Sequence, residues 1–350
     1  MHAPSVQRLT PEKRSNGDSV GRCWQKVDVG SKERGSIFKA FGNVSQARAM
    51  FERIPQGVGR PPVQECLMLG LIVACASVSM SYRKLEGFAA SFAEFLQVPT
   101  HLAPDHSTIN KFMSKADYAR VQSMLSAILV FDKPKAVYVA IDATGLATGK
   151  SGGWFSDKPG GDIRRGKYKK WHVVTDIETG FIVAWELTES DGEGSADAAV
   201  GPDLLVKAAQ KTKSEIKAVA ADGAYTGDPC FQAARKIGAA LLVPLPPNAV
   251  YSSKNKPKGT KPTDRDILLT QQSRLGRKEW KVESGYHQRS QAENTFSVTE
   301  KIWGNKLQHK TGHNQHLELI IKVHLFNKAV MSGQAALKQW LEHYEGRLKG

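Results

Sequence analysis

The spacing of apolar positions changes character near residue 130. Before this point, apolar side chains recur every three or four residues, as they do on one face of an amphipathic helix. Leu85, Phe88 and Phe92 are one such set. The helices predicted in this way cover residues 44–56, 63–98 with a break near 79–81, and 118–129.

After residue 130, short apolar runs typical of strands replace the helical pattern. Residues 136–142 alternate and end in Asp142, and residues 169–190 contain two apolar runs around the turn sequence DIETG, which predicts a hairpin. The remaining predictions are helices at 196–212 and 229–239, strands at 216–225 and 240–246, and helices again at 266–279, 286–302 and 314–345. Antiparallel strands followed by alternating helices and strands predict a mixed sheet with helices packed against it, an α/β (α+β) fold.

The composition is that of a globular protein with a substantial core. The chain has 350 residues, of which 41% are hydrophobic and 24% charged. Its most apolar segment, residues 66–82, is shorter than the roughly 20 residues that a membrane-spanning helix needs. The first residues lack the apolar run of a signal peptide. We therefore expect a cytoplasmic protein that does not enter the membrane.

The net charge of +15 is unevenly distributed. Residues 1–60 contain 11 Lys and Arg against 5 Asp and Glu, residues 150–170 contain 7 against 2, and residues 248–281 contain 9 against 3. Positive charge concentrated in a few stretches favours a polyanionic partner, whereas charge that serves solubility is spread more evenly. The pattern predicts a protein that binds nucleic acid.

Two short motifs point to other chemistry but lack the required spacing. Gly149-Lys150-Ser151 resembles the end of a phosphate-binding loop, but the glycine that such a loop needs five positions earlier is Thr144. The four cysteines have neither CxxC spacing nor a nearby pair of histidines. A structural zinc site and a disulfide framework are therefore not expected.

Three acidic residues are better candidates for the functional site. Asp142 and Asp222 each end a predicted buried strand, where a carboxylate either starts a turn or meets a cation, because an isolated buried charge is costly. Tyr286, Arg289 and Glu293 are spaced at i, i+3 and i+7, which places them on one face of a helix at ~100° per residue. The sequence thus offers three carboxylates for one site.

Several segments together resemble one family. They are RKLEGF (83–88) and PDHSTINKF (104–112), AIDATGL around Asp142, KKWHVVTDIETG (169–180), ADGAY around Asp222, and Tyr286-x2-Arg289-x3-Glu293. In this order and spacing they resemble bacterial and archaeal insertion-sequence transposases with an Asp-Asp-Glu triad, most closely the insertion sequence five family within the insertion-sequence four superfamily. The resemblance extends from about residue 60 to 330.

The resemblance implies a chemistry for the three carboxylates. Asp142, Asp222 and Glu293 would be both the catalytic residues and the ligands of two Mg²⁺ ions, for which Mn²⁺ is a substitute, with Asp142 bridging the ions. Tyr286 and Arg289 would hold the DNA backbone. The spacings of 80 and 71 residues within the triad suit a ribonuclease-H-like core without a large inserted domain.

The resemblance also implies a domain organisation and partners. We expect a flexible basic arm over 1–43, a helical DNA-recognition domain over 44–130, a ribonuclease-H-like catalytic domain over 135–332 and a C-terminal helix over 333–350. In the recognition domain, DHSTINKFMSK (105–115) is short and polar enough to enter a major groove. The partners would be double-stranded DNA, namely terminal inverted repeats and target, and further copies of the chain in a synaptic complex. The protein would be prokaryotic and associated with the nucleoid when bound to DNA.

One position departs from the family pattern. A lysine normally follows the glutamate by seven residues, but this chain has Glu300 there and Lys301 one position later. Either Lys301 makes the DNA contact after a local shift of the helix, or this copy lacks the contact. Two alternatives to a transposase remain, namely a structure-selective nuclease on the same core and an inactive DNA-binding protein derived from a transposase.

The basic stretches lead to a testable prediction. DNA affinity should fall steeply with salt concentration, because each Lys or Arg that contacts a phosphate releases counterions. Removing residues 1–40 should make the slope of log affinity against log salt less steep, as measured by fluorescence anisotropy with a labelled duplex. A slope near zero for the full chain would show that these stretches do not contact DNA.

Overall fold

The computed structural model describes residues 63–77, 80–128, 134–148, 168–190, 196–252 and 261–348. These residues form two compact units. The sheet unit contains the described residues of 134–147 and 168–305, and the helical unit contains those of 63–128 and 306–348. None of the described helices is long and apolar enough to cross a membrane.

The sheet unit is built on five strands in the order β3-β2-β1-β4-β5. The strands are β1 (Tyr138–Ala147), β2 (Tyr168–Asp176), β3 (Ile182–Glu189), β4 (Ala218–Ala221) and β5 (Ala240–Leu242). β1, β2 and β3 pair antiparallel, whereas β4 and β5 continue the sheet parallel to β1. This order and mixture of directions, with helices packed on the sheet, is the ribonuclease-H-like arrangement, so the predicted fold class is confirmed.

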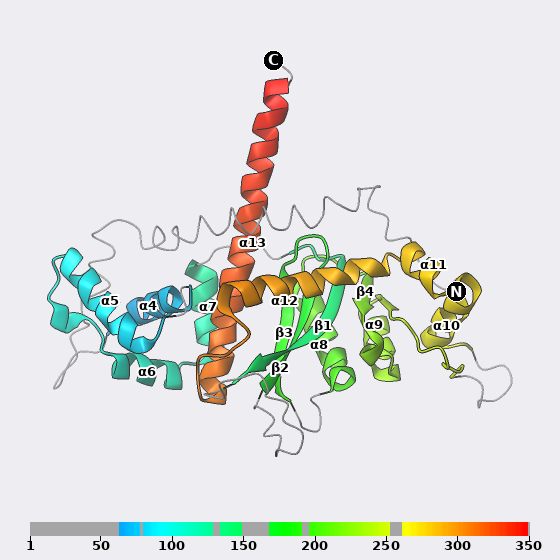
Figure 1. Cartoon of the computed structure of the whole chain (residues 1–350), viewed down its shortest axis with the longest axis horizontal. Coiled ribbons are helices and arrows are strands. Elements are labelled where there is room, and N and C mark those ends of the chain that lie inside the picture. Colours follow the sequence, from blue (N-terminus) through cyan, green and yellow to red (C-terminus); the bar gives the residue numbers. More distant parts are fainter. Residues whose placement is uncertain are drawn as a thin grey trace, which may run out of the picture. The chain divides into compact units, whose positions relative to one another are not determined.

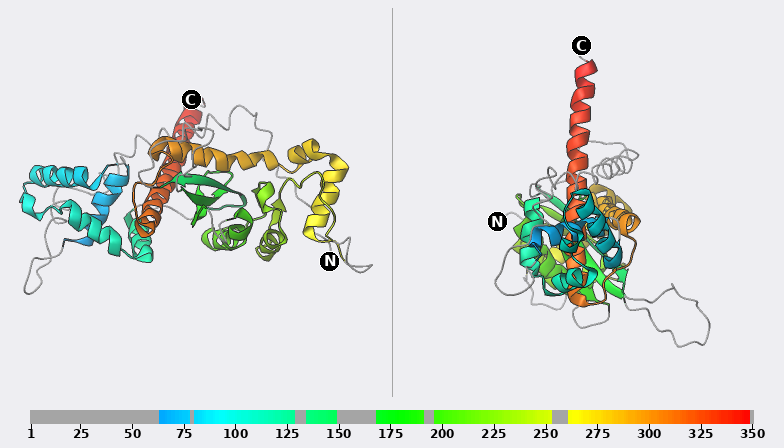
Figure 2. Two further views of the ribbon diagram at one scale, coloured as in Figure 1. Left: turned by 60° about the horizontal axis from the view of Figure 1, so that its bottom comes forward. Right: turned by 90° about the vertical axis from the view of Figure 1, so that its left-hand side faces the viewer.

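Helices cover both faces of this sheet (Figures 1 and 2). Helix α12 (Ser290–Trp303) contacts β1 and β2 on one face, where the Trp171 ring meets Phe296 edge-on with centroids 5.7 Å apart. Helix α8 (Asp197–Lys211) contacts β1, β2 and β3, and packs with α9 (Asp228–Lys236). Because both faces are covered, β1 is apolar at most positions, and β4 consists of alanine and valine alone.

Strand β1 is longer than the sequence predicts. The apolar run ends at Asp142, but the strand continues to Ala147, because β2 pairs with it from Val139 opposite Asp176 to Ala147 opposite Tyr168. Asp142 therefore lies in the middle of a strand and not at its end. Its neighbours in the sheet, rather than its own sequence, keep residues 143–147 extended.

Helix α8 contains a proline whose cost is partly offset by a cysteine. Pro202 has no N–H to donate to the carbonyl of Ala198 one turn earlier. The Cys230 thiol from α9 lies 3.7 Å from that carbonyl oxygen and donates to it. Burial raises the pKa of Cys230 to about 11, so this thiol is a structural donor and not a reactive nucleophile.

Two further helices and two 3₁₀ turns complete the sheet unit. They are η3 (Gly223–Tyr225), α10 (Asp264–Leu275), α11 (Arg277–Glu283) and η4 (Tyr286–Arg289). The sequence predicts a helix over 286–302, but its first turn is 3₁₀, and the α-helix begins only at Ser290. Gly285, at φ 70°, ends α11 in a left-handed conformation and redirects the chain into η4.

The helical unit is formed by segments from both sides of the sheet unit in the sequence. Its elements are α4 (Glu65–Ser77), α5 (Tyr82–Phe95), η2 (Thr100–Leu102), α6 (His106–Lys115), α7 (Tyr118–Ile128) and α13 (Gly312–Leu348). The break between α4 and α5 is the one predicted near 79–81, and Asp105 caps α6 by accepting the Thr108 N–H at 2.6 Å. Helix α13 contacts α4, α6 and α7.

The described units and the predicted domains divide the chain differently. Residues 306–332, which the domain prediction joins to the catalytic domain, group with the helical unit, and α13 runs from Gly312 to Leu348, close to the helix predicted over 314–345. The predicted arm over 1–43, the helix over 44–56 and most of the basic stretch 150–170 lie outside the described residues.

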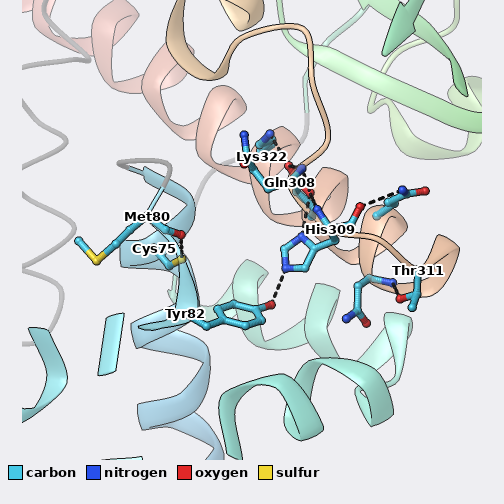
Figure 3. A network of polar contacts seen from close by, with 10 residues as sticks. Cys75, Met80, Tyr82, Gln308, His309, Thr311 and Lys322 are labelled. Atoms are coloured by element: carbon cyan, nitrogen blue, oxygen red, sulfur yellow. Dashed lines mark hydrogen bonds and ion pairs between the residues drawn. The ribbon is translucent and has the colours of Figure 1, made fainter. Parts of the chain in front are cut away.

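A buried carboxylate fixes the start of α13 (Figure 3). Glu318 is 3% exposed and accepts the backbone N–H groups of Gln308 and His309. It also accepts His309 Nδ1–H at 2.8 Å and pairs with Lys322 at 2.6 Å. With Nδ1 donating, Nε2 of a neutral His309 is free to accept the Tyr82 hydroxyl, whose oxygen lies 2.5 Å away. The network ties the segment before α13 to helices α5 and α13.

Burial by itself would raise the pKa of Glu318, but His309 and Lys322 outweigh it and lower the pKa to about 2. The folded-state pKa thus lies below the roughly 4.3 of an unfolded glutamate. The stabilisation is complete above that value and is lost as pH falls toward 2. Glu318→Gln, which leaves Lys322 unpaired and buried, should cost about 3–5 kcal/mol near neutral pH.

Denaturant unfolding between pH 7 and pH 2.5 tests this. The stability of wild type should fall more steeply below about pH 4 than that of Glu318→Gln. Glu94→Gln, at an exposed position of α5, is the matched control and should follow wild type. Parallel pH profiles for wild type and Glu318→Gln would contradict the assignment.

Candidate active site

Two of the predicted acidic residues are brought together by the pairing of parallel strands. In the register of β1 and β4, Ile141 lies opposite Ala221, and Asp142 and Asp222 are the next residues in each chain. The Asp142 carboxylate accepts the Ala143 N–H at 2.9 Å, and the Asp222 carboxylate accepts the Ala224 N–H at 2.8 Å and caps η3. The structure thus shows Asp222 at the end of a strand and at the start of a turn, the first of the two roles considered for it.

Arg289 links the third acidic residue, Glu293, to Asp142. Arg289 Nη1 donates to Asp142 Oδ2 at 2.6 Å, and its Nη2 donates to Glu293 Oε1. Arg289 ends η4, which contacts both β1 and β4, and Glu293 lies in the first turn of α12. One guanidinium group therefore joins the sheet to the helix that covers it.

Tyr286, three residues before Arg289 in η4, is largely buried. In a 3₁₀ turn, residues i and i+3 eclipse each other, so Tyr286 and Arg289 lie on one side of η4. The Tyr286 side chain is 8% exposed, its ring centroid is 5.5 Å from that of Trp280, and Lys281 Nζ lies 5.5 Å above the ring. Burial raises the pKa of its hydroxyl, so Tyr286 remains neutral.

The electrostatics of the site are dominated by crowded negative charge. Burial raises the pKa of Asp142 and the neighbouring Asp222 raises it further, whereas the Ala143 N–H and Arg289 act in the opposite direction. The pKa of Arg289 is raised, because Asp142, Tyr286 and Glu293 outweigh the effect of its own burial. Asp142 and Glu293 thus share one positively charged partner, the Arg289 guanidinium.

The donor chemistry suits a hard divalent cation, which prefers carboxylate oxygen ligands. Within the described ranges, however, no three His, Cys, Asp or Glu side chains converge closely enough to hold a metal ion. The contacts give the physical reason, since the Arg289 guanidinium bonds to both Asp142 and Glu293. The residue types fit a metal, while the position of the cation is taken by an arginine.

A comparison with protein families matches this part of the chain. The family model described as transposase DDE domain covers residues 133–328, more than half of the protein. The chain belongs to this transposase family. The matched region includes Asp142, Asp222 and Glu293, and extends from the sheet unit into the first half of α13.

Solved transposase structures show limited similarity to this chain. A piggyBac transposase synaptic complex with hairpin DNA is 8% identical over 91% of this chain and 76% of that chain, with a TM-score of 0.46. The Mos1 strand transfer complex is 14% identical over 84% and 96%, with a TM-score of 0.23. A mariner Mos1 paired end complex with Mg is 12% identical over 85% and 100%, also at 0.23.

Helix α12 does not shift to bring Lys301 into line with Glu293. It is α-helical to Trp303 and ends at Gly304, with the Gly304 N–H bonded to the Glu300 carbonyl at 2.7 Å. At ~100° per residue around the helix axis, Glu300 lies on nearly the same side of α12 as Glu293, whereas Lys301 is rotated by about 80° from Glu293. Both Glu300 and Lys301 are exposed. This helix has no over-wound turn that would bring Lys301 to the side on which Glu300 lies.

The sequence analysis missed a polar cluster on the other face of the sheet. His172 is fully buried, with Nε2 3.0 Å from Thr188 Oγ1 and Nδ1 3.3 Å from Asp197 Oδ1. Lys170 Nζ also reaches Asp197, at 2.9 Å. Only the alternation of Lys170 and His172 along β2 could have shown that they share a face, and their partner in α8 could not be read from sequence.

A glycine in α8 allows close packing behind Asp222. A Cβ atom at Gly201 would lie 2.9 Å from Tyr225 Cδ1 and 3.4 Å from Cys230 Sγ. The Tyr225 side chain is 1% exposed and belongs to the turn that Asp222 caps. The glycine is therefore needed for this close approach, and its replacement would move the tyrosine.

Gly201→Ala should destabilise the protein by about 1–3 kcal/mol, the usual cost of overpacking. The free energy of unfolding from chemical denaturation measures it. Gly87→Ala in α5 is the matched control, because no atom lies within 4 Å of its added Cβ and alanine favours helix. Equal stability of Gly201→Ala and wild type would show that Tyr225 is loosely packed.

Proposed function

We propose that this protein is a DNA transposase of the insertion sequence five family, within the insertion-sequence four superfamily, that cleaves and joins DNA at the ends of an insertion sequence. The observation that carries the proposal is the meeting of Asp142, Asp222 and Arg289 on one side of the sheet, with Glu293 joined through the arginine. Membership of the transposase DDE family supports it.

Under this proposal Asp142, Asp222 and Glu293 are the catalytic residues and hold two Mg²⁺ ions, with Mn²⁺ as a substitute. When bound, Mg²⁺ activates an attacking oxygen and stabilises the oxygen that leaves. The site lies beside the paired residues of β1 and β4, and α12 covers the sheet on that face. Trp171 and Phe296 fix the helix against the strands.

The remaining roles concern DNA. Arg289 holds a phosphate of the backbone, and Lys301, which is exposed but out of line with Glu293, reaches DNA from the side of α12. Tyr286, which is 8% exposed, acts mainly by positioning Arg289. The partners are double-stranded DNA, at terminal inverted repeats and at the target, and other copies of the chain in a synaptic complex. In the helical unit, α6 exposes Asn110, Lys111 and Ser114, polar groups suited to a groove.

The reaction consists of two transfers at phosphorus. In the first, the oxygen of a water molecule bonds to the phosphorus at the element's end, and the bond to the 3′ oxygen breaks and leaves a 3′-hydroxyl. In the second, that hydroxyl attacks a target phosphodiester and displaces a target 3′ oxygen. The triad requires no histidine as a general base, and His172 lies on the opposite face of the sheet from Asp142.

Alanine substitution of Asp142, Asp222 or Glu293 should reduce cleavage by at least about a thousandfold, the order of loss when a stabiliser of transition-state charge is removed. DNA binding should persist, because removing a carboxylate lessens repulsion of phosphate. Cleavage and strand transfer are measured with Mg²⁺ and a duplex that carries the element's own ends, and binding by filter retention.

Two exposed acidic residues of the same unit are matched controls. Asp203→Ala in α8 and Glu279→Ala in α11 remove the same charge away from the site and should cleave normally. Near-normal cleavage by any triad variant would contradict the assignment. Cleavage by wild type without joining would indicate a nuclease, and binding without cleavage would indicate an inactive DNA-binding protein.

A further inference from the structure

The guanidinium of Arg289 bridges two of the three carboxyl groups. It bonds to Asp142 at 2.6 Å and also pairs with Glu293. The side chains of Arg289 and Asp142 are only 19% and 17% exposed, so this pair is partly shielded from water, whereas Glu293 is 55% exposed. The contact with Asp142 is therefore the stronger of the two.

Charge balance shows why a cation is held here. Asp142 and Asp222 follow paired residues of β1 and β4, Glu293 is joined to Asp142 through Arg289, and Arg289 supplies one positive charge to this acidic group. Like charges in a partly buried site raise each other's free energy, as Asp222 does for Asp142. A divalent ion would offset this charge better than the arginine does, but it needs the same carboxylate oxygens.

From these contacts, and resting on the function proposed above, we propose that Arg289 is an internal competitor of the metal, which exchanges its carboxylate partners for a DNA phosphate when a divalent cation binds. Without DNA, the guanidinium occupies the oxygens of Asp142 and Glu293. With DNA, a phosphate offers the same two-pronged acceptor that a carboxylate offers, so the arginine changes partner and frees both carboxylates.

The exchange couples the two ligands thermodynamically. If a phosphate draws Arg289 away, DNA raises the affinity for the metal, and by reciprocity the metal raises the affinity for DNA by the same factor. A metal-free site then keeps one positive charge, that of Arg289, beside its carboxyl groups in the absence of substrate. The cation is bound tightly only where DNA is already present, which restricts the loaded site to the substrate complex.

The local structure allows an arginine, and not a lysine, to make this exchange. A guanidinium group has donors on two separate nitrogens and can bridge two carboxylates, whereas an ammonium group acts as a single point charge. Arg289 sits at the junction of η4 and α12, between a 3₁₀ turn and an α-helix. The side chain is thus anchored on rigid backbone next to Tyr286, while its end group is free to change partner.

Mn²⁺ binding to the full chain tests the exchange, with free Mn²⁺ followed by electron paramagnetic resonance. Without DNA, Arg289→Gln should bind Mn²⁺ about tenfold more tightly than wild type, because one charge-assisted contact no longer competes. Adding a random-sequence 20-base-pair duplex, with its own Mn²⁺ binding subtracted, should raise the affinity of wild type more than that of Arg289→Gln. Equal or weaker Mn²⁺ binding by Arg289→Gln without DNA would overturn the proposal.

A matched control separates the local effect from overall charge. Arg274→Gln, at an exposed position of α10, removes the same positive charge from the same unit and should leave the Mn²⁺ affinity unchanged. A rise equal to that of Arg289→Gln would mean that net charge alone is responsible, and would also overturn the proposal.

Two more variants make the outcome decisive. Arg289→Lys keeps the charge but cannot bridge both carboxylates, so its Mn²⁺ affinity should lie between those of wild type and Arg289→Gln. If Arg289→Gln does not fold, the Mn²⁺ affinity of Arg289→Lys decides the question. An affinity no higher than that of wild type would then overturn the proposed exchange. Asp142→Asn should abolish Mn²⁺ binding. Unchanged binding in Asp142→Asn would refute the metal site itself, which is a different failure from that of the arginine exchange.

Discussion

Repulsion between two carboxylates on adjacent parallel strands is the constraint around which the sheet unit is arranged. Asp142 and Asp222 follow paired residues of β1 and β4, so the backbone that forms the sheet also holds them side by side. Neither can move away without breaking that pairing. Arg289 offsets this repulsion through its bond to Asp142. It reaches Asp142 because η4, which ends at Arg289, contacts both strands.

The alternation of side chains then separates the two faces of the sheet into different environments. Asp142 lies opposite Val173, and both belong to the face covered by α12, whereas His172 lies opposite Ala143 on the face covered by α8. Asp142 and the buried cluster of His172 with Asp197 are thus on neighbouring residues of the sheet, yet on opposite sides of it. This separation keeps the histidine apart from the candidate site.

Much of this arrangement could be predicted from local pattern. The hairpin of β2 and β3, the break before α5, and the order of strands and helices after residue 196 all depend on side chains close together in sequence. Two features could not be predicted. Residues 143–147 are extended because β2 pairs with them, and the segment after Gly285 begins as a 3₁₀ turn because it packs on β1 and β4.

In the candidate site, too, one part could be predicted from the sequence and the other depends on tertiary packing. The spacing of Tyr286, Arg289 and Glu293 indicated a shared face, and Tyr286 and Arg289 do share one side of η4. Their partners could not be inferred, because the bond of Arg289 to Asp142 joins residues 147 positions apart. The burial of Tyr286 against Trp280 has the same origin, since it depends on how α11 meets η4.

The division of the helical unit between two distant segments has a consequence during synthesis. Helices α4, α6 and α7 emerge from the ribosome first, but α13, which they contact, follows more than 180 residues after α7. At typical translation rates this delay is roughly 10 to 40 s. Throughout that time the apolar surfaces that later contact α13 lack their native cover, while the residues of the sheet unit are being made. Nascent chains should therefore be most exposed to chaperones and proteases at their amino-terminal helices, although these are made first.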